Sequence, residues 1–263
     1  RALRPPRPRC RAAEAEAAAG GRSVLESLLL EGATALSEAD VRCIEERHLL
    51  VRKPGCDAAG WLGSVGAGRR CRHGWPQALM LDPLRTGIFR DTVRLTCPLL
   101  VQAIDEYERG GAILDFNRRV LEDESWREAL YGVNCAQRDL RRRLVEGREE
   151  AVAEARRATG DATVDFVLES GLSTLRLNRT DVKCLHAQVA DELTRGGNVI
   201  GQQVLQDLAA RGVDVHGSGT CCDHCNVSVP LGQGRWKFSH SKNKVGQRLN
   251  KLALSQQPAG TAK

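Results

Sequence analysis

The sequence contains few aromatic residues and no long hydrophobic run. Only 4% of its 263 residues are aromatic, whereas 41% are hydrophobic. The core must therefore rest on Leu, Val, Ile and Ala, a set that suits helices better than a β-sandwich. No stretch of about 18 apolar residues occurs, so we expect a soluble chain without a membrane partner. Gly-x-Gly-x-x-Gly turns, Walker loops and paired-histidine metalloprotease motifs are also missing, which leaves no sequence sign of those enzyme classes.

Acidic residues are missing from both ends of the chain, although the net charge is only +6. Residues 1–11 carry five arginines and residues 226–263 carry seven Lys or Arg. The Arg/Ala/Pro-rich opening predicts a transit peptide for a chloroplast or another organelle, with a disordered extension of a cytoplasmic protein as the alternative. The basic residues 226–263 could contact an acidic protein or RNA, or could serve only as a solubilising tail.

The ten cysteines lack the even, dense spacing of a small secreted disulfide scaffold. A protein of a reducing compartment, with thiols that bind metal or take part in redox chemistry, explains these cysteines better than a secreted disulfide scaffold does. Three parts of the chain are expected: a disordered or targeting segment with a short helix over residues 1–36, a domain over 37–212, and a basic, cysteine-bearing tail over 213–263.

The expected fold class is α+β, mainly α, with a short β-hairpin packed among several helices. A helix should begin at Ser37, where Ser-Glu-Ala-Asp forms a capping box. Residues 52–75 read as a loop and 160–182 as a connecting segment. The hairpin is expected at 77–81 and 88–95. Further helices are expected at 98–110, 113–121, 123–159, 184–193 and 201–210.

Three motifs stand out together, at residues 70–76, 95–98 and 182–187, the last followed by Gly-Asn-Val-Ile-Gly at 197–201. Their order and spacing resemble the bacterial domain-of-unknown-function family 501 over about residues 37–212, with this chain as an algal or plastid-type member. The resemblance implies a fold and a set of positions but no reaction. Asp191 stands where the family usually has a second histidine, and Val199 replaces its usual proline.

The motif cysteines are candidate ligands for a structural zinc ion. Zinc takes four thiolate or imidazole ligands in a tetrahedral set. Cys71, Cys97 and Cys184 would supply thiols and His186 the fourth ligand, with His73 or Asp191 as alternatives. Simple packing of buried cysteines is the competing explanation.

Two further hypotheses concern the cysteines: a thiol-dependent enzyme and a second zinc site. Cys97 lies just before a predicted helix, whose N-terminus would lower its pKa, so a thiol-dependent enzyme could use Cys97 with His186 as the base. Cys222 and Cys225 have the spacing of half a second zinc site. The sequence therefore predicts an accessory or regulatory module stabilised by zinc, with a thiol enzyme and an RNA- or protein-binding module as alternatives.

Overall fold

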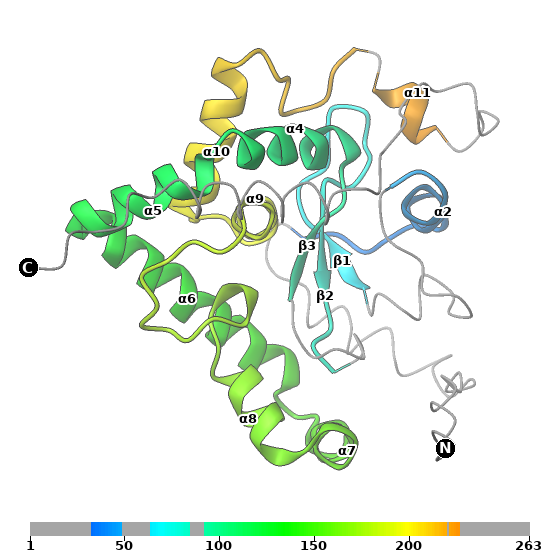
Figure 1. Cartoon of the computed structure of the whole chain (residues 1–263). Helices are drawn as coiled ribbons and strands as arrows, with labels where there is room; N and C mark the ends of the chain where they lie inside the picture. The colour runs from blue at the N-terminus through cyan, green and yellow to red at the C-terminus, as the bar shows by residue number, and fades with distance from the viewer. Residues whose placement is uncertain (1–32, 49–63, 85–91, 220, 227–263) are drawn as a thin grey trace, which may run out of the picture.

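The computed structural model describes residues 33–48, 64–84, 92–219 and 221–226. Within them the fold is α+β and mainly α, as expected (Figure 1). The first half contains α2 (Glu38–Glu46), β1 (Ser64–Ala67), β2 (Ala78–Leu81), β3 (Val93–Leu95), α4 (Pro98–Arg109) and α5 (Ala112–Glu122). The second half contains α6 (Glu124–Val145), α7 (Glu149–Thr159), α8 (Asp161–Leu168), the 3-10 turn η1 (Leu172–Thr174), α9 (Leu185–Thr194), α10 (Val199–Ala210) and α11 (Cys222–Cys225).

The sheet has three antiparallel strands in the order β1-β2-β3. The predicted hairpin is confirmed, because Ala78 pairs with Leu95 and Met80 with Val93, whereas residues 85–91 lie outside the described part. Strand β1 falls in a segment that was expected to be loop, and this expectation was wrong. The strand is only four residues long, and its alternation is broken by a register shift between Ser64 and Gly66, so its sequence carries no clear strand signal.

Both faces of strand β2 are covered. Ala78 and Met80 belong to the main core, to which α9 contributes Leu185 and Val189. On the opposite face Leu79 and Leu81 pack against Ile44 of α2. The sheet therefore lies between α9 and α2 (Figure 1), which explains why β2 is apolar at every position.

The capping box at the start of α2 is confirmed: Ser37 accepts a hydrogen bond from the Asp40 amide, and the Asp40 carboxylate accepts one from the Ser37 amide. The expectation of a single long helix over 123–159 was wrong, because α6 ends at Val145 and a new helix, α7, begins at Glu149. Gly147 provides the break, with a left-handed φ of 72° that other residues rarely adopt. Helix α8 also replaces part of the expected connecting segment.

The short N-terminal helix expected within residues 1–36 and the basic residues after 226 lie outside the described part of the chain. Among the described residues, no helix has both the length and the apolar character needed to cross a membrane.

Candidate metal centre

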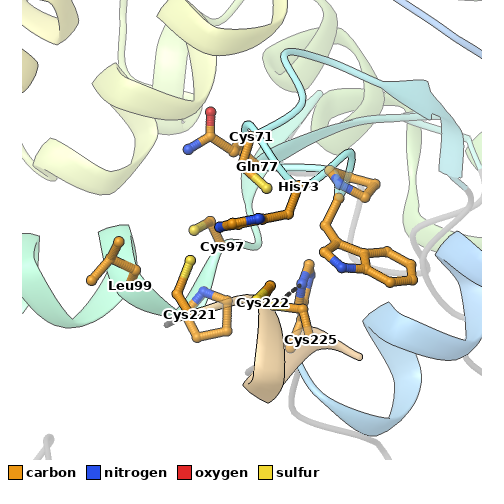
Figure 2. A pocket seen from close by; sticks show the side chains of 12 residues that line it. Cys71, His73, Gln77, Cys97, Leu99, Cys221, Cys222 and Cys225 are labelled. Carbon is orange, nitrogen blue, oxygen red and sulfur yellow. Dashed lines mark hydrogen bonds between the residues drawn. The ribbon is translucent and has the colours of Figure 1, made fainter. Parts of the chain in front are cut away.

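Thiols and imidazoles from distant parts of the chain surround one small pocket (Figure 2). The pocket has a cavity volume of about 20 Å³. Its lining consists of His48, Cys71, His73, Trp75, Pro76, Gln77, Cys97, Pro98, Leu99, Cys221, Cys222 and Cys225. We call it the thiol pocket.

A tight turn carries Cys71 and His73 to the thiol pocket. The Cys71 amide donates to the Trp75 carbonyl at 2.9 Å, and the Gly74 amide donates back to the Cys71 carbonyl at 2.9 Å. Gly74 has a φ of +85°, which allows this reversal. The glycine of the first motif is thus required by the turn that presents its cysteine.

An ion pair anchors this turn to α2. Both terminal nitrogens of Arg70 donate to the carboxylate of Asp40, at 2.7 and 2.9 Å. Burial alone would raise the pKa of Asp40, but the hydrogen bonds from Arg70 and Ser37 hold it below its usual value. Asp40 of the capping box of α2 therefore also positions the loop that carries two pocket residues.

Cys97 lies between β3 and α4, and its backbone amide donates to the Gln77 carbonyl at 3.1 Å. Burial raises the pKa of the Cys97 thiol to about 12, and hydrogen bonds from the amides of Leu100 and Leu99 offset only part of this shift. This differs from the expectation that the helix N-terminus would lower it, because removal from water outweighs two amide donors.

The chain after α10 returns to the turn that carries Cys71 and closes the thiol pocket. The Arg72 amide donates to the His216 carbonyl at 2.7 Å, and the Gln77 side chain donates to the Val215 carbonyl at 2.8 Å. The His73 Nε2 lies 2.7 Å from the Ser218 carbonyl. These contacts attach the first part of the predicted tail to the domain; the boundary at residue 213 itself stays a prediction.

Cys43, His48 and Cys225 form the tightest group of potential metal ligands around the thiol pocket. Their ligand atoms all lie within 4.8 Å of one another, and all three residues are buried. The Nε2 of His48 is 3.3 Å from the Cys43 Sγ and 3.5 Å from the Cys225 Sγ. Its Nδ1 lies 2.6 Å from the Thr96 hydroxyl, which fixes the ring orientation. This group could bind a metal ion.

The structure divides the four predicted ligands between two places. Cys71 and Cys97 line the thiol pocket, whereas Cys184 and His186 lie together with Glu108 in a second group whose ligand atoms are within 4.8 Å of one another. The Cys184 Sγ is 3.8 Å from the His186 Nδ1, which is 3.3 Å from the Glu108 carboxylate.

His186 connects the start of α9 to α4. Its Nε2 lies 3.3 Å from the carboxylate of Asp105. Burial alone would lower the pKa of His186, but hydrogen bonds to Cys184 and Glu108 raise it to about 10.

Asp191, the alternative fourth ligand, is the centre of a buried polar network away from the pocket lining. Its carboxylate accepts hydrogen bonds from Arg195 at 3.0 and 2.7 Å and from the side-chain Nδ2 of Asn198 at 2.8 Å. The Gln137 side chain donates to it as well. Because these three donor residues already hold both oxygens, Asp191 serves to join α6 to the α9–α10 connection.

Sequence reasoning overlooked Cys43 and His48. Their only signal is a spacing of five residues across the end of α2, which is too common to mark a ligand pair. The sequence places Cys225 with Cys222 in a possible site within the tail, and nothing in it indicates that the segment after α10 meets α2.

Comparison with known protein families gives a match over the middle of the chain, where the three motifs lie. The model described as protein of unknown function (DUF501) matches residues 67–206. This span contains Cys71, Cys97 and Cys184, while Cys43 and Cys225 lie outside it. No curated protein and no solved structure matches the chain. Since the matched residues make up more than half of the chain, this protein belongs to the DUF501 family.

Proposed function

We propose that this protein is a non-enzymatic accessory module whose fold is held together by a zinc ion bound to Cys43, His48 and Cys225. The observation that carries the proposal is the close approach of three buried donors from two ends of the described chain. Zinc favours thiolate and imidazole ligands, and a structural site takes four of them. The remaining position would be filled by Cys222 of the thiol pocket or by water.

The distances between the donors suit an ion at their centre. Bonds of about 2.3 Å to sulfur and 2.0–2.1 Å to nitrogen at tetrahedral angles separate S and N by roughly 3.5 Å. The corresponding separations from His48 are 3.3 and 3.5 Å. With the Nδ1 proton donated to Thr96, the Nε2 lone pair faces both sulfurs, which is the usual arrangement of a zinc-bound histidine.

An ion in this place would fasten the segment around α11 to α2. Metal binding to a site that does not exist in the unfolded chain contributes directly to folding free energy. Helix α11 has only four residues, too few to be a stable helix alone, so an external clamp would matter most here.

The burial of Cys97 supports a non-enzymatic role over thiol catalysis. Nucleophilic cysteines need a lowered pKa, whereas the pKa of Cys97 is raised to about 12. Its proposed base, His186, is held instead by Glu108 and Asp105. Binding of RNA or an acidic protein through residues 226–263 stays a prediction.

The proposal is tested by zinc content and thermal melting of the full-length protein, purified under reducing conditions. Cys43→Ala should contain one zinc equivalent less than the wild type, because a ligand is lost. Its melting temperature should fall, and added chelator should lower that temperature by less than it does in the wild type. His48→Gln should behave in the same way.

Cys135→Ser on α6 is the matched control, since Cys135 is outside the thiol pocket, and it should keep the full zinc content. Unchanged zinc in both Cys43→Ala and His48→Gln would contradict the proposal.

A further inference from the structure

After Cys43, His48 and Cys225 are assigned, the lining of the thiol pocket still contains four thiols and one imidazole, from Cys71, Cys97, Cys221, Cys222 and His73. We propose that this cavity holds a second zinc ion, with Cys71, His73, Cys97 and Cys221 as its ligands. This set does not include any ligand of the first ion, so it stands or falls separately. Three thiolates and one imidazole form one of the standard closed sets of structural zinc sites.

The four side chains face a common space. Figure 2 shows Cys71, His73, Cys97 and Cys221 around the pocket, contributed by the turn after β1, the start of α4 and the start of α11. The cavity of about 20 Å³ exceeds the roughly 10–15 Å³ that one water-sized body needs. A single ion therefore fits, whereas an organic ligand does not.

His73 has the hydrogen bond that a ligating histidine requires. Its Nε2 is 2.7 Å from the Ser218 carbonyl, which can only accept, so Nε2 carries the proton and donates it. The Nδ1 lone pair is then available for a metal. A backbone carbonyl on the other ring nitrogen is a common way to fix the tautomer of a metal ligand.

Gly217 brings His73 and Cys221 to the same place. A Cβ atom on Gly217 would lie 3.4 Å from the His73 Cδ2 and 3.5 Å from the Cys221 Sγ. The Gly217 φ of +110° also requires glycine. Both side chains thus border the backbone of the segment that returns to the domain, and that segment positions Cys221 opposite the turn that carries Cys71.

The helix start at Cys97 favours a thiolate once a cation is present. The amides of Leu99 and Leu100 donate to the Cys97 sulfur. Such amide hydrogen bonds stabilise a metal-bound thiolate. The second set is less compact than Cys43, His48 and Cys225, because no three of its four ligand atoms all lie within 4.8 Å of one another. Ion binding would therefore draw the segment that carries Cys221 inward. This is feasible because the segment meets the turn through one backbone hydrogen bond, two side-chain hydrogen bonds and the Arg72–Asp214 ion pair.

The proposal of a second ion is tested by measuring how many zinc ions each single-substitution variant binds. Native mass spectrometry and elemental analysis of the full-length protein should give two zinc ions for the wild type. Cys97→Ser and Cys71→Ser should each retain one, and Cys43→Ala should also retain one. Cys135→Ser on α6 is again the matched control, because Cys135 lies outside the thiol pocket and outside both groups of potential metal ligands, and it should retain two.

The ion left in Cys43→Ala should show three sulfur ligands and one nitrogen ligand by X-ray absorption. Cys71 is half-buried, so Cys71→Ser keeps the test available if the Cys97 variant does not fold.

The two proposals fail in different ways. If the wild type binds one ion that Cys43→Ala removes and Cys71→Ser and Cys97→Ser keep, the second ion is refuted and the first stands. If both Cys71→Ser and Cys97→Ser lower the count while Cys43→Ala and His48→Gln do not, the first is refuted and the second stands. A single ion lost in both kinds of variant indicates one shared site and overturns the two-ion arrangement.

Discussion

Gly201 shows how one residue sets the distance between two helices. A Cβ atom at this position would lie 2.3 Å from the Gln188 carbonyl oxygen and 2.7 Å from the Glu192 Cβ, both on α9. Helices α9 and α10 can therefore approach this closely only with glycine at the crossing. Asn198, three residues earlier, caps α10 by accepting a hydrogen bond from the Gly201 amide at 2.8 Å. The motif at 197–201 is thus explained by the N-terminal cap of α10 and by the close crossing of α9 and α10.

We expect Gly201→Ala to lower the free energy of unfolding by about 1–3 kcal/mol, because the added methyl group must push α10 away from α9. Gly132→Ala on α6 is the matched control, since a Cβ there meets nothing within 4 Å. It should raise stability by about 0.5–1 kcal/mol through better helix propensity. Urea unfolding monitored by circular dichroism measures both, and equal effects of the two changes would refute the close-crossing explanation.

At the scale of elements, His186 and Glu108 connect α9 to α4. Glu108 accepts a hydrogen bond from the Leu185 amide at 2.8 Å, which caps the start of α9, and it lies 3.3 Å from His186. One carboxylate thus serves the helix terminus and the imidazole, and Asp105 faces the other ring nitrogen at 3.3 Å. The protonated imidazole is therefore the form that this junction stabilises.

This junction predicts a pH-dependent stability. The pKa of His186 is raised from 6.5 to about 10, so protonation stabilises the folded protein. The contribution is complete below about pH 6.5 and is lost as the pH rises toward 10, with a slope of at most about 1.4 kcal/mol per pH unit. His186→Gln should remove this slope. The measurement is the difference in unfolding free energy between wild type and variant from pH 6 to 10.5, with chelator present in both. A difference that does not change over this range would refute the prediction.

At the scale of the whole molecule, the segment after α10 completes the thiol pocket. It supplies Cys221 and Cys225 and hydrogen-bonds to the turn around residues 70–77 through His216, Val215 and Ser218. In Figure 1 this segment passes over the end of α4 and reaches α11 close to α2. The N-terminal and C-terminal parts of the described chain therefore meet at one place.

Two truncations separate the contribution of this segment from that of the basic residues. Removal of 213–263 should abolish zinc binding at both proposed sites and lower the melting temperature by about 5–10 °C, because several kcal/mol of contacts and metal binding are lost. Removal of 227–263 keeps all the proposed ligands and should leave zinc content and melting nearly unchanged. Equal melting temperatures for the two truncated proteins would show that residues 213–226 add no stability.

The sequence by itself determined the elements whose signals are local. The capping box placed the start of α2, Pro98 and the apolar spacing placed α4, and the turn chemistry between two apolar runs indicated the hairpin. The motif order identified the family. Cys71 and Cys97, which the cysteine pattern singled out, line one pocket, and their role as zinc ligands stays a prediction. Local hydrogen bonding and side-chain periodicity are properties of neighbouring residues, so sequence reasoning reaches them.

Only the tertiary structure decided which donors meet. Cys43, His48 and Cys225 come together because α2 packs on Leu79 and Leu81 and because the chain returns to the Cys71 turn after α10. Cys184 and His186 are instead drawn to Glu108 by the packing of α9 on α4. Such partners are chosen by contacts between segments that are far apart in sequence, and these contacts depend on the combined packing of many side chains rather than on any local pattern.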